Sequence, residues 1–320
     1  MIPSKFYPLA FARSSLPALA AVFLSATGIA ADKTMPAGAS AFTETGAVTV
    51  SRERQFEFTS GINGVPYRVM ISAPKMEEGK RYPVLFVLDG YWYFRIASDI
   101  VTWGSGSFEP AIVVGIGYPT EDRAEISRRR AVDLTIVEEK KYFPNGSGGC
   151  DAFLRVIEEE VKPFVTARYA VDPSRYMLFG KSLGGLAVLR ALFKNPERYS
   201  TYLSSSPSIW QGDRALLEGE AAFTEKVRGG SLTLRLMLSV GSDEEYKGTN
   251  PQKKADDEIN GMVPNAKGLA ERLSKPGPDK VAVRFASFAD ENHSTVSPIA
   301  IARAIAFALP PPPKPKSQKK

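Results

Sequence analysis

The sequence predicts an α/β fold in which a mostly parallel, doubly wound sheet follows an antiparallel N-terminal hairpin. Two continuous apolar runs, YPVLFVLDG and AIVVGIGYP, are typical of strands buried on both faces of a parallel sheet. From the first run onward, strand-like and helix-like segments alternate, as they do in repeated βα units. Before it, two segments alternate apolar and polar residues around the turn GINGV, which predicts the hairpin.

Each element follows from its own apolar pattern. Period-two alternation marks the hairpin strands, and continuous apolar runs mark the buried strands. Apolar residues at helical spacing mark the helices, most clearly over 151–169, where the other face is acidic. We see no internal repeat and no linker, so we expect a single domain. The predicted elements are hairpin strands 55–60 and 65–74, strands 82–90 and 111–119 with helix 91–103 between them, helix 151–169, and strand–helix units over 175–196, 199–227, 232–273 and 281–309.

The first 31 residues have the pattern of a secretory signal peptide. Lys5 and Arg13 precede an apolar run over about 16–29, and small residues follow it at Ala30 and Ala31. The run is too short to span a membrane comfortably, so we expect no stable membrane anchor. The mature protein is therefore expected to be periplasmic or secreted.

The basic net charge belongs to the ends of the chain. Of 41 Lys and Arg residues, two lie in the signal segment and four in the tail 310–320. The expected globular domain, residues 32–309, then carries 35 basic and 35 acidic residues. A neutral domain gives no reason to expect a nucleic-acid partner. We expect the Pro- and Lys-rich tail to be disordered.

Two residue types occur once each. Cys150 is the only cysteine, so an intramolecular disulfide is impossible. His293 is the only histidine, so a metal site with two histidine ligands is excluded, and we expect no metal and no cofactor.

A nucleophile motif lies between a predicted strand and a predicted helix. Residues 180–184 read GKSLG, a G-x-S-x-G pattern, and its glycines permit the strained, closely packed turn of a nucleophile elbow. Ser182 would then stand at the strand tip, with the amide of Leu183 directed toward a developing oxyanion. The alternative is an ordinary turn of small residues with packing glycines.

A serine hydroxyl needs a base, and His293 lies C-terminal to Ser182 in a polar loop after the last predicted strand. The order nucleophile, acid, histidine requires an acid between them, at the end of the intervening strand. The segment LSVGSDEEY offers Asp243, Glu244 and Glu245, and spacing alone does not separate these three.

These motifs together resemble the putative-esterase branch of the α/β-hydrolase superfamily, which includes enterobactin-type siderophore trilactone esterases and, more distantly, esterase D. The resemblance runs from about residue 50 to residue 309. The segments that carry it are YPVLFVLDGYWYF, RRRAVDLT, GKSLGGLAVLRALFKNPERYSTYLSSSPSIW, LSVGSDEE and ADENHSTVSPIAIARAIAFAL.

The resemblance implies roles for particular residues. It implies Glu244 as the triad acid and a second oxyanion amide at Gly90 or Tyr91. It also implies that Arg130 faces the ligand and that Trp210 lies at the pocket rim. Alternatives remain for the last two: an ion pair between Arg130 and the acidic helix around residue 158, and a packing role for Trp210.

Lys181 departs from the family pattern, which often has histidine or another neutral residue before the nucleophile. A cation at this position would favour anionic substrates or the oxyanion, so we include it among candidate substrate-binding residues. Four arginines in the stretch after the strand at 111–119 would add to a positive field, and they favour a polyanionic ester. They are Arg123, Arg128, Arg129 and Arg130.

The sequence thus predicts an exported serine hydrolase that cleaves carboxylic esters through an acyl-enzyme, with a small-molecule ester such as a ferric siderophore trilactone as substrate. The alternatives are a short-chain or aryl carboxylesterase and a non-catalytic binding protein on the same fold. Acyl transfer to an acceptor other than water would use the same residues.

Overall fold

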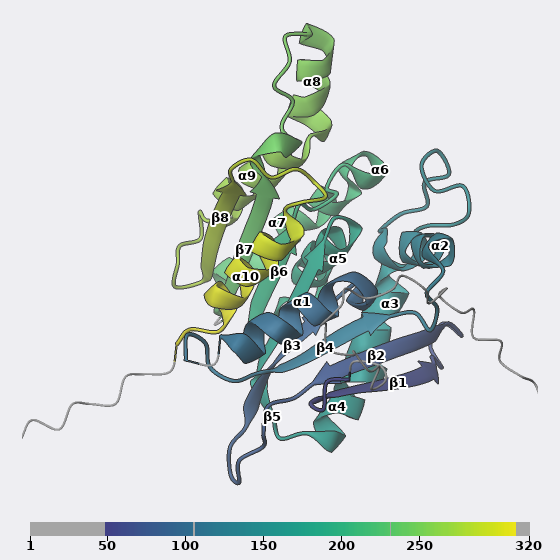
Figure 1. Ribbon diagram of the computed structural model, residues 1–320. Helices are drawn as coiled ribbons and strands as arrows, with labels where there is room; N and C mark the ends of the chain where they lie inside the picture. Colours follow the sequence, from purple (N-terminus) through teal and green to yellow (C-terminus); the bar gives the residue numbers. More distant parts are fainter. Residues whose placement is uncertain (1–48, 105, 231, 312–320) are drawn as a thin grey trace, which may run out of the picture. The chain divides into compact units, whose positions relative to one another are not determined.

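An eight-stranded mixed sheet forms the centre of the described part of the chain (Figure 1). The computed structural model describes residues 49–104, 106–230 and 232–311. The predicted signal segment, residues 1–31, and the tail from residue 312 onward lie outside these residues, so both stay predictions. The chain from Val50 onward clusters as one compact unit.

The sheet confirms the predicted architecture. Its strand order is β1-β2-β4-β3-β5-β6-β7-β8. Strand β2 pairs antiparallel with β1 and with β4, and the remaining pairs from β4 to β8 are parallel. The strands are β1 Glu53–Thr59, β2 Pro66–Ser72, β3 Tyr82–Val87, β4 Ile112–Gly117, β5 Val171–Lys181, β6 Thr201–Ser205, β7 Leu234–Gly241 and β8 Val281–Phe288.

Helices cover both faces of the sheet. On one face, α1 packs on β4 and α10 packs on β5, β6 and β7, and the two helices contact each other. On the other face, α5 packs on β5 and β6, and α9 packs on β7 and β8. The helices are α1 Gly90–Trp103, α2 Arg123–Leu134, α3 Cys150–Val156, α4 Lys162–Arg168, α5 Leu183–Lys194, α6 Gln211–Arg214, α7 Glu220–Gly229, α8 Pro251–Asn260, α9 Met262–Leu273 and α10 Ser297–Ala308.

Short 3-10 or π segments join some of these elements. A π-helical turn, η1 Ile157–Val161, joins α3 to α4, so the predicted helix over 151–169 is continuous but contains a bulge. The others are 3-10 turns: η2 Pro196–Arg198, η3 Ala215–Gly219 and η4 Ser242–Glu244.

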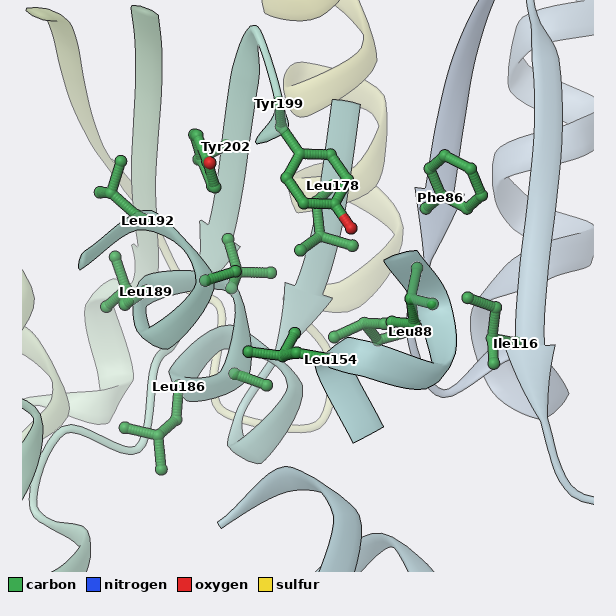
Figure 2. Close-up of a cluster of buried hydrophobic side chains, with 14 of the residues drawn as sticks. Phe86, Leu88, Ile116, Leu154, Leu178, Leu186, Leu189, Leu192, Tyr199 and Tyr202 are labelled. Carbon is green, nitrogen blue, oxygen red and sulfur yellow. The ribbon is translucent and has the colours of Figure 1, made fainter. Parts of the chain in front are cut away.

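The core consists of apolar side chains on both faces of the central strands. All six residues of β3 and all six of β4 are buried, which is why these strands lack alternation in the sequence. Figure 2 shows part of the larger cluster, on the face that α5 covers. Its labelled side chains come from several strands, from two helices and from connecting segments: Phe86, Leu88, Ile116, Leu154, Leu178, Leu186, Leu189, Leu192, Tyr199 and Tyr202.

One helix differs from the sequence expectation. No helix or strand was predicted between residues 119 and 151, and residues 123–134 form α2. Asp122 precedes the helix, and its side chain accepts a hydrogen bond from the Ala124 amide at 2.9 Å. An N-cap aspartate followed three residues later by Glu125 is the usual signal of a helix start, so the sequence did contain the signal for this helix.

Another difference concerns the predicted polar helix that ends near Leu273. It is two helices, α8 and α9, which meet at Gly261. Helix α8 packs chiefly on α9 and extends away from the sheet (Figure 1). Among the described residues, no helix combines the length and apolar character needed to cross a membrane.

Candidate active site

The elbow between β5 and α5 holds Ser182 in a strained conformation. Its φ is 60° and its ψ is −121°, values that a residue with a side chain rarely adopts. A Cβ at Gly180 would clash with the carbonyl oxygen of Gly184, and one at Gly185 would lie 2.8 Å from the Ser205 carbonyl oxygen. Both glycines therefore serve the close packing of strand against helix that exposes the serine.

His293 lies against this serine from the loop between β8 and α10. Its Nε2 is 3.1 Å from Ser182 Oγ. The neighbouring Asn292 fixes the loop, because its Oδ1 accepts hydrogen bonds from the amides of Ser294 and Thr295. The imidazole is partly exposed, with 42 % of its side-chain surface accessible. It is therefore held in place and still open to a substrate.

Glu244 completes a chain of three side chains. Its Oε2 lies 3.3 Å from His293 Nδ1, and the carboxylate is only 2 % exposed. Its Oε1 accepts hydrogen bonds from Ser206 Oγ at 2.6 Å and from the Gly241 amide at 3.1 Å. Burial acts to raise the pKa of Glu244, but the hydrogen bonds from His293, Ser206 and Gly241 outweigh it and lower the pKa below its ordinary value. The acid is thus kept ionised.

The other two acids after β7 point elsewhere. Asp243 is exposed and forms an ion pair with Lys247, and Glu245 is also exposed. The backbone of this turn is tied to the histidine loop, because the Asp243 amide donates to the Glu291 carbonyl at 2.9 Å. Of the three acids that spacing left open, the geometry therefore favours Glu244.

Candidate oxyanion donors lie at two helix N-termini. Leu183 is the first residue of α5 and Gly90 the first of α1, and amides in a first helical turn have no intrahelical acceptor. The two helix starts are neighbours, because a Cβ at Gly184 would lie 3.3 Å from Asp89 Oδ2. Tyr91 follows Gly90 and is exposed. The oxyanion roles of Leu183, Gly90 and Tyr91 stay predictions.

Arg130 lies beside the elbow, and its ion-pair partner is not the acidic helix around residue 158. Its guanidinium makes a bidentate ion pair with Asp89 at 2.9 and 2.8 Å. The proposed alternative, a pair with the acidic helix around residue 158, is wrong, since Glu158 pairs with Lys162. Burial acts to lower the pKa of Arg130, but the charge of Asp89 outweighs it and raises the pKa. Direct substrate contact by Arg130 stays a prediction.

The expected positive field of four arginines is about half neutralised, since two carboxylates pair with three of them. Arg128 and Arg129 both bond to Glu125 on the same helix, and Arg130 is occupied by Asp89. Arg123 is exposed at the start of α2. These side chains lie on a helix with nearby acids, so they offer weaker support for a polyanionic substrate than the sequence suggested.

Lys181 is buried, with 4 % of its surface exposed. Burial lowers its pKa, the nearby charge of Glu244 opposes this, and Arg130 adds to it. Little of the side chain is accessible from solvent, so its substrate-binding role has no direct support and stays a prediction.

Trp210 lines a cavity of about 450 Å³. Its ring meets the Tyr142 ring edge-on, with the ring centroids 5.3 Å apart. It lies nearly parallel to the Phe143 ring, with the centroids 6.5 Å apart. The remaining lining is polar and mostly acidic: Glu139, Lys141, Asp213, Asp256 and Asn260. Since Trp210 is two residues from Ser208, whose amide donates to the Ser182 carbonyl, the cavity lies near the elbow. Its use as a substrate pocket is a prediction.

Two serines at the site were missed by sequence reasoning. Ser206 binds Glu244, and Ser208 Oγ lies 3.3 Å from Ser182 Oγ. Both lie in the segment SSSPSIW, whose composition does not show which hydroxyls face the site. Asp89, the partner of Arg130, was also missed as a site residue, although it directly precedes Gly90.

Comparisons with known proteins identify the family of this chain. Residues 60–276 match the model of the family described as "Putative esterase". The chain is 30 % identical over 253 residues to the ferri-bacillibactin esterase BesA of Bacillus subtilis, covering 75 % of this chain and 84 % of the relative. It is 30 % identical over 279 residues to the siderophore triacetylfusarinine C esterase of Aspergillus fumigatus, covering 81 % and 93 %.

A solved structure is also similar. The BES protein from Bacillus cereus superposes with a TM-score of 0.73 at 31 % identity, covering 83 % of this chain and 99 % of that one. The matched region includes the elbow and the β6 and β7 loops, and the sheet has the predicted antiparallel start and mostly parallel strands. The chain therefore belongs to this esterase family within the α/β-hydrolase superfamily, and it is a carboxylic-ester hydrolase.

Proposed function

We propose that this protein is a serine esterase in which Ser182, His293 and Glu244 form the catalytic triad. The observation that carries the proposal is the continuous chain of contacts from Ser182 Oγ to His293 at 3.1 Å and from His293 to Glu244 at 3.3 Å. The strained elbow at Ser182 adds support, because such strain persists at sites where it serves a function.

The hydrogen-bond directions set the order of proton transfers. An ionised Glu244 can only accept, so Nδ1 of His293 carries the proton and Nε2 is free to accept one. Ser182 then passes its proton to Nε2 as Oγ attacks the ester carbonyl. When the tetrahedral intermediate collapses, the imidazolium donates this proton to the leaving alkoxide. Water, activated by the same imidazole, releases the acid from the acyl-enzyme.

The amides of Leu183 and of Gly90 or Tyr91 would stabilise the oxyanion. Each is at the N-terminus of a helix, where unpaired N–H groups and the helix dipole favour negative charge. Removal of one oxyanion donor in such sites costs about 10²- to 10³-fold in kcat.

For the substrate, we propose a siderophore ester. The relatives' names support this class, since they are esterases of ferri-bacillibactin and of triacetylfusarinine C. The cavity lined by Trp210 and Tyr142 is large enough to hold one arm of such a molecule. The ion-paired arginines argue against a dominant role for substrate charge, so we do not restrict the class to anionic catecholates.

We also propose that the protein is exported, on the basis of the signal pattern in residues 1–31. Cell fractionation and the intact mass of the mature protein test this. Export predicts a periplasmic or secreted protein that lacks about 31 N-terminal residues. A full-length protein in the cytoplasm would contradict it.

The substrate proposal is tested by a panel of esters. It should contain a catecholate trilactone and triacetylfusarinine C, each with and without iron, next to p-nitrophenyl acetate and butyrate. The proposal predicts a higher kcat/KM for at least one siderophore ester than for both p-nitrophenyl esters. The opposite ranking would favour a general short-chain or aryl carboxylesterase. Added alcohol acceptors would reveal acyl transfer as new ester products.

A further inference from the structure

The segment between β6 and α6 contacts both ends of the proposed triad. Ser206 Oγ lies 2.6 Å from Glu244 Oε1, and Ser208 Oγ lies 3.3 Å from Ser182 Oγ. The two serines are separated only by Pro207, and both are buried. One short segment thus contacts the acid with one hydroxyl and the nucleophile with another.

We propose that Ser206 and Ser208 are positioning residues that hold Glu244 and Ser182 in register with His293. The inference rests on the proposed triad and extends it to two residues that act through its members. Neither is placed to attack the substrate or to accept a proton from it in the reaction described above.

Ser206 has a defined role in this arrangement. Because an ionised carboxylate only accepts, the Ser206 hydroxyl must donate to Glu244 Oε1. With the Gly241 amide on the same oxygen, this leaves Oε2 to accept from His293. Hydrogen bonds to a charged group are short and strong, as 2.6 Å indicates. Ser206 therefore both orients the carboxylate and favours its ionised form.

The backbone at Ser206 indicates that this position is specialised. Its φ is 41°, in the left-handed region that glycine occupies at little cost and other residues avoid. Its amide donates to the Ser239 carbonyl of β7 at 2.6 Å, which fixes the strained residue against the strand that leads to Glu244. A serine kept in a conformation that favours glycine suggests a use for its hydroxyl.

Ser208 acts at the other end of the triad. Since Ser182 donates its proton to His293, the Ser182 oxygen is free to accept from the Ser208 hydroxyl. The Ser208 amide donates to the Ser182 carbonyl at 3.1 Å, so backbone and side chain hold the nucleophile together. The hydroxyl would favour the Ser182 rotamer that faces the imidazole.

Ser206→Ala, Ser206→Gly and Ser208→Ala test the inference, with Ser205→Ala as the matched control. The Ser205 hydroxyl, at the last residue of β6, is buried directly before Ser206 and has no hydrogen-bond partner among the described residues. The glycine variant removes the hydroxyl and relieves the strained φ, so backbone strain cannot account for a loss of activity there. Thermal unfolding of each variant checks the fold, and p-nitrophenyl butyrate is the substrate.

We expect both Ser206 variants to lower kcat about tenfold with KM nearly unchanged. In the pH profile of kcat/KM, the acid limb, where activity falls at low pH, should move upward by about one pH unit. Without the hydroxyl, Glu244 binds a proton at higher pH and draws the imidazole proton more strongly. The other titratable side chains that influence Glu244 in the described structure are His293 and Lys181, and neither is altered. Ser208→Ala should lower kcat about tenfold without moving this limb.

A double-mutant cycle with Glu244 separates a positioning role of Ser206 from a general packing role. In a Glu244→Ala background, Ser206→Ala should change the residual kcat less than twofold, because its target is absent. A further tenfold loss there, or an unchanged acid limb in both single Ser206 variants, would overturn the role of Ser206. Wild-type kcat in Ser208→Ala would overturn the role of Ser208.

The same assays distinguish failure of the inference from failure of the proposed triad. If Ser182→Ala abolishes turnover while the Ser206 and Ser208 variants match Ser205→Ala, only the inference is wrong. If Ser182→Ala keeps wild-type turnover, the triad is wrong and the inference fails with it.

Discussion

The loops that hold the proposed triad and the segments around Trp210 are built in different ways. The triad loops follow β5, β6, β7 and β8, and each is bonded to its neighbours. The segments around Trp210 come from residues 136–149, α6 and α8, and they bring together aromatic rings and acids on a more exposed surface. We call the first set the triad loops and the second the Trp210 rim.

This difference suggests a division of labour. The triad loops are fixed by glycine packing and by hydrogen bonds between adjacent strand ends, which leaves little freedom for change. The segments of the Trp210 rim are distant in sequence and are held together by side-chain contacts. In one of these, the Gln211 side chain donates a hydrogen bond to the Val137 carbonyl. We expect changes in the triad loops to affect the chemical step, and changes in the rim to affect which ester binds.

The largest expected effect comes from Glu244→Gln. The amide cannot hold the imidazole in the required tautomer, so kcat/KM should fall about 10³- to 10⁴-fold. Asp243→Asn is the matched control, because this neighbouring side chain is exposed and pairs with Lys247. Steady-state kinetics on p-nitrophenyl butyrate measure both. Equal losses in the two variants would contradict the assignment of the acid.

Arg130→Lys has the next largest expected effect. Lysine keeps the charge but cannot reproduce the bidentate bond to Asp89, which lies beside Gly90 and the elbow. We expect kcat to fall about tenfold for neutral and anionic p-nitrophenyl esters alike. Loss of the bidentate pair with Asp89 should shift the neighbouring Gly90 amide, a candidate oxyanion donor. A loss confined to the anionic ester would instead support direct substrate contact by Arg130.

Trp210→Ala should change binding rather than chemistry. If the rim holds one arm of a large ester, KM for a siderophore ester should rise about tenfold while kcat for p-nitrophenyl acetate stays near wild type. The exposed Trp103 at the far end of α1 gives a matched control, Trp103→Ala. A comparable loss of kcat on the small ester would show that Trp210 supports the triad loops.

The last expected effect is on stability and not on activity, and it arises where α2 meets the sheet. Asp133 accepts hydrogen bonds from Tyr67 and Tyr118, and burial raises its pKa to about 6. A raised pKa means that its contribution to stability is present below about pH 4 and is lost as the pH rises through 6. Asp133→Asn should therefore gain up to about 3 kcal/mol relative to wild type between pH 4 and pH 7.

Urea unfolding at several pH values measures this change. Asp279→Asn, at an exposed carboxylate, should leave the pH dependence of wild type intact. An Asp133→Asn variant whose stability relative to wild type does not vary between pH 4 and pH 7 would contradict the raised pKa.

The sequence was informative where one local pattern determines the structure. Buried runs gave β3 and β4, and the glycines around Ser182 gave the elbow, because backbone sterics leave few alternatives there. The single histidine gave the base candidate without any geometry. These features cover two central strands of the sheet and two of the three proposed triad residues, Ser182 and His293.

Other features depend on contacts that no local pattern contains. The choice of Glu244 over Asp243 depends on which side chain turns inward after β7, and the partner of Arg130 depends on the position of α2 relative to Asp89. The roles of Ser206 and Ser208 depend on a turn two strands away from His293 in the sheet. Helix α2 was missed although its N-cap pattern is present, because its mostly polar and charged residues show no clear apolar face.

The most direct test of the proposed mechanism is a burst experiment on p-nitrophenyl acetate with mass spectrometry of the trapped enzyme. We predict a burst of p-nitrophenol that is stoichiometric with active enzyme and lost in Ser182→Ala and His293→Ala. A fluorophosphonate should label the peptide that contains Ser182. Turnover that persists in Ser182→Ala, or a label on another residue, would contradict the account.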